Sequence, residues 1–78
     1  MITTTRTRTE AGEIRYTTSD EASEIHAGTI IRPFGGERFD VESVEVKSYG
    51  ETIFKNYHGE TLRMASSNRV EILGHYNP

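Results

Sequence analysis

One predicted strand constrains the fold most, because its apolar residues change phase partway along it. Phe39 and Val41 lie two residues apart and therefore share one face of an extended strand. Val44 and Val46 also share a face, but a regular strand would turn this pair to the opposite side. A β-bulge near Glu42-Ser43 adds one residue and returns all four side chains to one side. The pattern predicts a bulged strand over residues 38–47 of an antiparallel sheet.

The rest of the chain shows weaker strand signals. Residues 1–10 alternate Thr and Arg without an apolar face, which predicts an edge strand or a mobile arm. A turn at Ala11-Gly12 is expected to join this segment to the next strand as a hairpin. Apolar and polar residues in strand-like patterns predict further strands over residues 13–17, 29–32, 60–65 and 69–73.

Two stretches carry helix-capping patterns. Thr18 and Glu21 have the spacing of a capping box, and Gly28 is a typical stop signal, so a helix is predicted near 19–27. Ser48 and Glu51 repeat the box, and the apolar residues that follow have helical spacing, which predicts a second helix near 49–58. The alternative for this second stretch is a strand between two hairpin turns.

The expected fold is therefore α+β. A single domain over 1–78 would hold an antiparallel sheet of four to five strands and two short helices near 19–27 and 49–58. The alternative is a small all-β barrel with 44–73 as a meander. Only 33% of the residues are apolar, so the core is small for a chain of 78 residues. A partner surface, in a homodimer for example, would complete such a core.

The composition argues against several kinds of chemistry. There is no cysteine, and the three histidines lack the spacing of a metal site. Ser66-Ser67 lies in a predicted turn without an activating base. We therefore expect no enzyme, no cofactor, no metal and no small-molecule substrate. The absence of cysteines and of an apolar leader or span predicts a cytoplasmic protein that does not enter a membrane.

The same bulged strand carries a family resemblance. Gly36-Glu37-Arg38-Phe39, followed by valines at 41, 44 and 46 with acids between them, resembles a segment of small phage-encoded anti-CRISPR proteins that act on type I systems. The resemblance is confined to this strand and transfers no functional residue. It implies an inhibitor that binds stoichiometrically to a Cas protein or surveillance complex in the cytoplasm of a bacterial host.

The net charge of −3 supports a related expectation about the binding site. An acidic face would engage a protein partner with a basic, nucleic-acid-binding surface. The alternative is a small nucleic-acid-binding or regulatory module that uses the N-terminal arginines Arg6, Arg8 and Arg15. Most aromatic residues are interpreted as core, and a stacking platform is the alternative. The predicted acidic face consists of Asp20, Glu21, Glu24, Asp40, Glu42 and Glu45.

Overall fold

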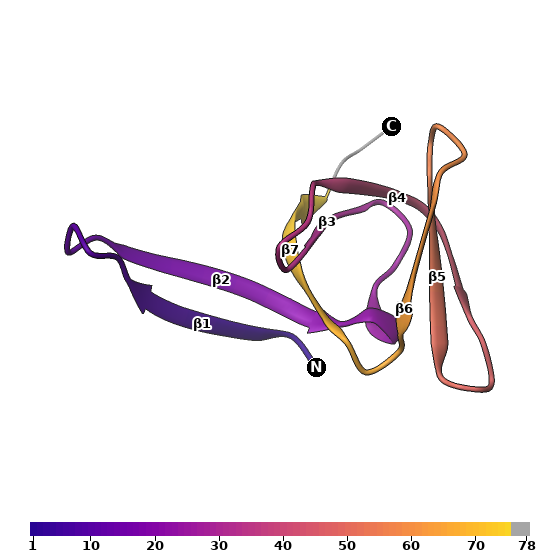
Figure 1. The fold of residues 1–78 in the computed structure, drawn as a ribbon, viewed down its shortest axis with the longest axis horizontal. Coiled ribbons are helices and arrows are strands. Elements are labelled where there is room, and N and C mark those ends of the chain that lie inside the picture. Colours follow the sequence, from indigo (N-terminus) through magenta and orange to yellow (C-terminus); the bar gives the residue numbers. More distant parts are fainter. Residues whose placement is uncertain (76–78) are drawn as a thin grey trace.

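The computed structural model describes residues 1–75 and contains seven antiparallel strands in one sheet. The strand order is β1-β2-β7-β3-β4-β5-β6, so β1 and β6 are the two edges (Figure 1). Residues 76–78, the end of the predicted domain 1–78, lie outside the described residues. The strands are β1 (Thr3–Arg8), β2 (Ile14–Glu21), β3 (Thr29–Pro33), β4 (Phe39–Val46), β5 (Glu51–Asn56), β6 (Thr61–Ala65) and β7 (Arg69–His75).

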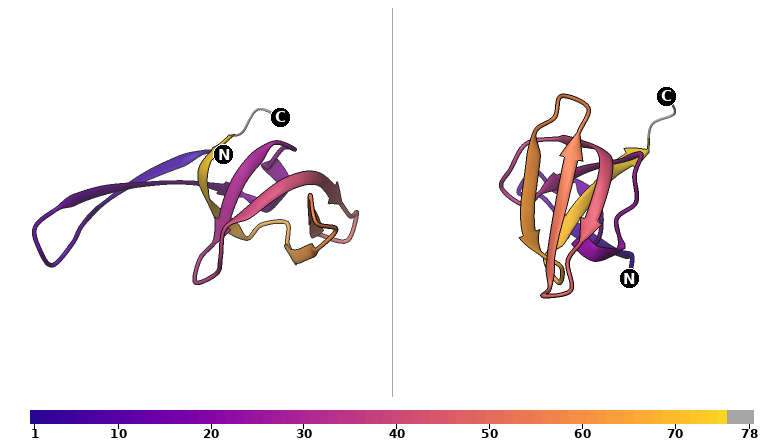
Figure 2. Two further views of the ribbon diagram at one scale, coloured as in Figure 1. Left: turned by 90° about the horizontal axis from the view of Figure 1, so that it is seen from above. Right: turned by 90° about the vertical axis from the view of Figure 1, so that its right-hand side faces the viewer.

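The sheet has two parts of different shape. Strands β3 to β7 curl into a half-barrel, which we call the body (Figure 1). The hairpin of β1 and β2 projects from the body as a twisted two-stranded ribbon, and Figure 2 shows this projection from above. The molecule measures 41 × 29 × 19 Å as a result, with the ribbon along its longest axis.

The core lies on the concave side of the half-barrel. Phe54 and Ile31 are its largest fully buried apolar side chains. Residues directly opposite in the ladder point to the same side, and Ile31 faces Phe39 and Ile72, which pack against the core. The buried apolar residues are Ala22, Ile25, Ile31, Val41, Phe54 and Val70.

The bulge predicted near Glu42-Ser43 is confirmed. Val41 pairs with Asn56 and Ser43 pairs with Lys55, so Glu42 is the extra residue on β4. Val41 is buried and Val44 is half-buried against the core, which shows that the bulge restores the inward phase. Val46, at the end of the strand, has the same phase but is exposed.

The predicted α+β class is wrong, since no α-helix occurs in residues 1–75. In place of a helix over 19–27, β2 continues to Glu21, and a single 3₁₀ turn, η1 (Ala22–Glu24), follows. Asp20 pairs with Val70 and Glu21 pairs with Arg69 of β7. The capping pattern is a local signal, and the sheet pairing with a strand from the far end of the chain overrides it.

The helix predicted near 49–58 is also wrong, because this stretch is β5 between two hairpin turns. Thr52, Phe54 and Asn56 are buried with the period of a strand, whereas Tyr49 and Tyr57 lie exposed in the turns. Residues 44–65 thus form the meander that the all-β alternative expected. That alternative was wrong for β7, which leaves the meander and inserts between β2 and β3.

Three hairpins have the same loop design, and two of their loops flank β5 in the stretch that was predicted as a helix. Each loop has three residues and ends in a glycine with φ between 82° and 85°, a left-handed conformation that glycine adopts without a steric penalty. In each, the residue before the loop donates its amide to the carbonyl of the glutamate after the glycine, at 2.7 to 3.0 Å. The loops are Glu10-Ala11-Gly12, Ser48-Tyr49-Gly50 and Tyr57-His58-Gly59.

We predict that Phe54→Ala lowers the free energy of unfolding by about 3–5 kcal/mol, because it removes a fully buried ring and leaves a cavity. Urea unfolding followed by circular dichroism measures the loss. Tyr49→Ala is the matched control, since its exposed ring should cost at most about 0.5 kcal/mol. Equal losses in the two variants would contradict the placement of the core.

A second prediction concerns the bulge. Deleting Glu42 removes the extra residue and leaves the valines of β4 in the inward phase, so this variant should fold. Deleting Asp40 instead places Phe39 and Val41 side by side, so one must turn outward and folding should fail. Dispersed amide signals in a two-dimensional NMR spectrum would distinguish the two variants. Loss of folding in the Glu42 deletion alone would refute the assignment of Glu42 as the extra residue of the bulge.

Candidate functional site

The projecting ribbon is the least supported part of the structure. We call residues 3–18 the arm. Only the end of β2, Ser19 to Glu21, pairs with the body, and all six residues of β1 are exposed. A two-stranded hairpin without a third strand or a packed face is marginally stable in water. The arm therefore contributes little to folding, and a binding role would explain its presence better than a structural one.

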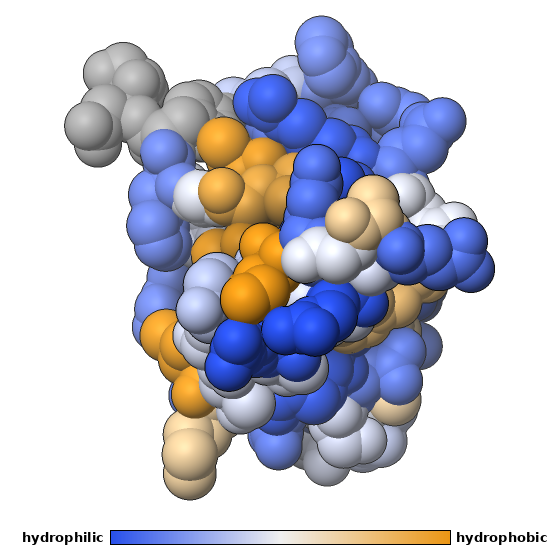
Figure 3. Space-filling view, turned by 90° about the vertical axis from the view of Figure 1, so that its left-hand side faces the viewer, coloured by the Kyte–Doolittle hydropathy of each residue, from blue (hydrophilic) through white to orange (hydrophobic). Residues whose placement is uncertain are grey.

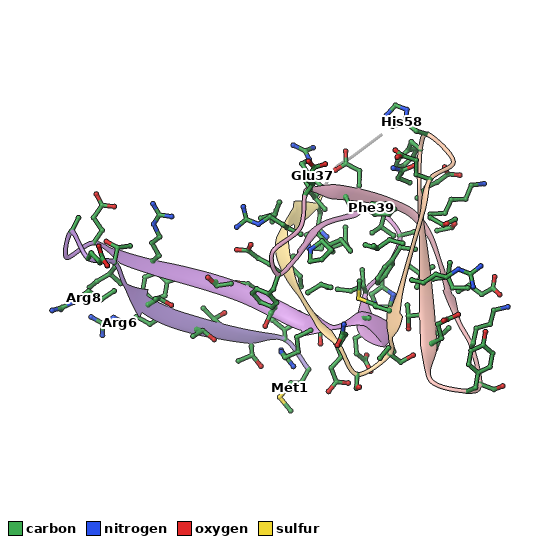
Figure 4. The ribbon with its side chains drawn as sticks, viewed as in Figure 1. Met1, Arg6, Arg8, Glu37, Phe39 and His58 are labelled. Carbon is green, nitrogen blue, oxygen red and sulfur yellow. The ribbon has the colours of Figure 1, made fainter. Side chains whose placement is uncertain are left out.

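The register of the hairpin gives the arm two chemically different faces. Arg6 lies opposite Tyr16 and Arg8 lies opposite Ile14, so these four side chains share one side with Thr4 and Thr18. The hydroxyl oxygens of Thr4 and Thr18 are 3.4 Å apart, consistent with this pairing. Figure 4 shows Arg6 and Arg8 on the same side of the ribbon, far from the body residues Glu37, Phe39 and His58. We call this side the Arg/Tyr face.

The opposite side of the arm carries mainly hydroxyl groups. Alternation along the strands places Thr3, Thr5, Thr7 and Thr17 there, together with Arg15. The tip is the loop Glu10-Ala11-Gly12. We call this second side the threonine face.

The arginines of the arm differ from most cations of the body in their partners. Within residues 1–75, no carboxylate forms an ion pair with Arg6, Arg8 or Arg15. Four body cations are paired with carboxylates, and Lys55 and Arg69 are not. The pairs are Arg32 with Glu71, Arg38 with Asp40, Lys47 with Glu45 and Arg63 with Glu51.

Charge is also divided unequally along the chain. Residues 3–19 hold three arginines and two glutamates, a formal charge of +1. The remaining residues hold six cations and ten carboxylates, a formal charge of −4. The arm is thus a positively charged projection from a negatively charged body.

The structure does not bring the predicted acidic residues into one face. Asp20 is buried on the inner side of β2, and its neighbour Glu21 points to the outer side. Glu24 is exposed in η1. The other three lie on β4, which β7 and β3 separate from β2. They are Asp40, Glu42 and Glu45.

Several of these carboxylates are already engaged. The Nε of Arg38 donates to Asp40 at 2.9 Å, and Lys47 pairs with Glu45. This pairing raises the pKa of both cations, first through the hydrogen bond and then through the opposite charge. Of the predicted acidic site, Glu24 and Glu42 are exposed and have no ion-pair partner among the described residues.

Asp20 has a structural role at the base of the arm. Its Oδ1 accepts hydrogen bonds from the Met1 ammonium and from the Glu21 amide, both at 2.7 Å. Burial by itself would raise the pKa of Asp20. These hydrogen bonds and the nearby positive charges outweigh burial, so the pKa of Asp20 is lowered. The hydrogen bond to Asp20 is also the main reason why the pKa of the Met1 ammonium is raised.

The body contains cavities lined by charged and polar side chains. Two adjoining cavities of about 320 and 350 Å³ lie between the β3–β4 and β5–β6 connections, and both include Arg38, Asn56 and Glu60. Arg38 is paired with Asp40, and the Asn56 side chain bonds Glu60 and the His58 and Glu60 amides, so these groups hold the turns in place. No cluster of metal-ligating side chains occurs in residues 1–75.

Comparisons with family models, curated proteins and solved structures found no match to this chain. In the described part of the chain, no helix has the length and apolar character needed to cross a membrane. The assignment of a function therefore depends on the geometry and charge of the molecule itself.

Sequence reasoning identified Arg6, Arg8 and Arg15 but missed the residues beside them. Tyr16 was interpreted as core, yet its side chain is 68% exposed, and Ile14 is 43% exposed. The alternation of Ile14, Arg15 and Tyr16 indicated a half-buried strand. A signal against burial was available in the partner segment, because residues 3–9 offer no apolar side chains that could cover Tyr16.

The anchoring of Asp20 predicts a pH dependence. Because its pKa is lowered in the folded state, its contribution to stability is present above the ordinary value of 3.8 and is lost as the pH falls through the lower folded pKa. The raised pKa of the Met1 ammonium adds a contribution that is present below 8.0 and is lost as the pH rises through the folded value.

Urea unfolding as a function of pH tests this prediction. Asp20→Asn should be less stable than the parent by about 1–3 kcal/mol near pH 6, because it removes the charge from a buried hydrogen-bonded group. The difference should shrink below pH 3.8. Glu24→Gln, at an exposed carboxylate without an ion pair, is the control and should leave the profile unchanged. A constant difference down to pH 2 would contradict the assigned role.

Proposed function

We propose that this protein is a non-enzymatic nucleic-acid-binding module that contacts the phosphate backbone through its arm. The observation that carries the proposal is the placement of three arginines without carboxylate partners on a projecting ribbon of an otherwise acidic chain. Cations that neutralise phosphates release bound counterions, which supplies most of the affinity of such contacts.

The shape of the arm suits this role. A projecting two-stranded antiparallel ribbon is narrow and can expose both of its faces to a nucleic-acid ligand. Threonine hydroxyls on the arm add donors for phosphate oxygens. The rest of the chain carries a formal charge of −4 and is repelled by phosphate, so contact should be confined to the arm.

The inhibitor of a Cas protein, expected from the anti-CRISPR resemblance, is the second candidate. It is supported by exposed carboxylates of the body that form no ion pair within residues 1–75, among them Glu24, Glu37 and Glu42. Such a protein would bind the basic surface of its partner and would have no affinity for free nucleic acid. The two candidates therefore differ in a direct binding measurement.

The proposal predicts a salt-dependent affinity for DNA or RNA that the arm arginines determine. Each of Arg6→Gln, Arg8→Gln and Arg15→Gln should weaken binding and reduce the slope of log K against log salt by about 0.7–0.9. Fluorescence anisotropy with labelled oligonucleotides between 20 and 200 mM salt measures both quantities. Lys55→Gln is the matched control, because Lys55 is an exposed body cation that also lacks a carboxylate partner.

Neutralising Glu10 and Glu13 should have the opposite effect on affinity from neutralising the arginines. Both carboxylates lie at the tip of the arm and repel phosphate. The double variant Glu10→Gln, Glu13→Gln should therefore have a higher affinity for nucleic acid. Absence of binding at 20 mM salt would refute the proposal. Equal losses in the arm variants and in Lys55→Gln would also refute it, since binding would then follow net charge rather than the arm.

A further inference from the structure

We infer that the ligand of the arm is a single-stranded nucleic acid and that one of its bases stacks on Tyr16. This inference rests on the proposed function, and it assigns a specific role to the Arg/Tyr face. Tyr16 is 68% exposed although it lies in the middle of a regular strand, and its side chain forms no hydrogen bond with the described residues. An aromatic ring in this position has a free face that is available for stacking.

The neighbours of Tyr16 supply the second part of the site. Arg6 lies directly opposite Tyr16 across the ladder, at a distance of about 5 Å between Cβ atoms, and Arg8 lies two residues further toward the tip, about 7 Å along the strand. The site thus combines one ring with two arginines that form no ion pair within residues 1–75. A base on Tyr16 would leave its flanking phosphates within reach of Arg6 and Arg8, which is the combination that proteins use to hold single strands.

The geometry disfavours a duplex as the preferred ligand. Paired bases are stacked on each other and present only their edges in the grooves, so a ring on the flat face of a ribbon has no base face to contact. An unpaired strand exposes its bases and can place one of them on the ring. Tyr16 thus adds affinity for a single strand and little for a duplex, whereas the arginines act on both.

Carboxylates at both ends limit the length of the Arg/Tyr face. Glu10 and Glu13 lie at the tip. At the base the face ends at a cavity of about 140 Å³, whose lining includes Asp20 and Glu24. Between these ends, Ile14 to Thr18 spans about 13 Å, which accommodates about four stacked nucleotides. Figure 3 views the molecule from the side on which the arm projects, and apolar side chains gather there among polar ones.

The test compares a labelled 12-nucleotide oligo(dT) with a 12-base-pair duplex at low salt by fluorescence anisotropy. The parent protein should bind the single strand more tightly. Tyr16→Leu should weaken binding to the single strand by about 5- to 100-fold and change duplex binding by less than about 2-fold. Tyr16→Phe keeps the ring and should retain the affinity. Tyr49→Leu removes an equally exposed ring from the body and is the control.

The outcomes separate this inference from the proposed function. Equal affinity for single strand and duplex, or full affinity in Tyr16→Leu, overturns the inference. If Arg6→Gln and Arg8→Gln still weaken binding in that case, the proposed function stands without it. No binding of either oligonucleotide removes both. Because Tyr16 is exposed, a circular dichroism spectrum like that of the parent is expected for each variant, so that a loss of affinity reports on binding.

Discussion

The pairing of β7 between β2 and β3 is the interaction on which the rest of the structure depends. This strand comes from the C-terminal part of the chain, yet it joins the arm to the half-barrel. Arg69 strengthens the junction, since its guanidinium donates to the Ser19 hydroxyl, the Ser19 carbonyl and the Met1 carbonyl. Without β7 the inner face would lose Val70, and the hairpin would have no attachment to a packed sheet. A short junction of this kind fixes the direction of the arm while leaving both of its faces exposed.

Local patterns in the sequence were sufficient for some elements and insufficient for the fold class. The bulge on β4 follows from the phase of four apolar residues, which no other regular arrangement explains. The hairpin at Ala11-Gly12 is also confirmed. The helix near 49–58 was wrong because the spacing of Ser48 and Glu51 fits a hairpin loop of this chain as well as a capping box. The helix near 19–27 was wrong because pairing of β2 with β7 overrides the local capping pattern. The recurring Gly-Glu pair after two loop residues, present in all three hairpins, was the better signal.

The sequence likewise predicted some residues of the candidate site but not their arrangement in space. The clustering of Arg6, Arg8 and Arg15 near the N-terminus identified them as an alternative site. The predicted acidic residues are divided for a topological reason, since strand order decides which carboxylates are neighbours, and β3 and β7 lie between β2 and β4. The amino-acid composition also does not show which charged residues form ion pairs. Asp40 and Glu45 are neutralised by cations on their own strand or beside it, which a count of charges does not reveal.

The separation of charge between arm and body has a further consequence for how a ligand is held. A uniformly basic surface of this size would bind nucleic acid in many positions, because the phosphate contacts carry no positional information. Here the carboxylates at the tip and at the base of the arm leave a short basic segment between them, and the acidic body repels phosphate beyond it. An overall charge of −3 is therefore compatible with nucleic-acid binding. In the proposed function, the acidic residues would restrict where nucleic acid binds. Most cations of the body are paired within residues 1–75, so the arm is the main source of unpaired positive charge in this part of the chain.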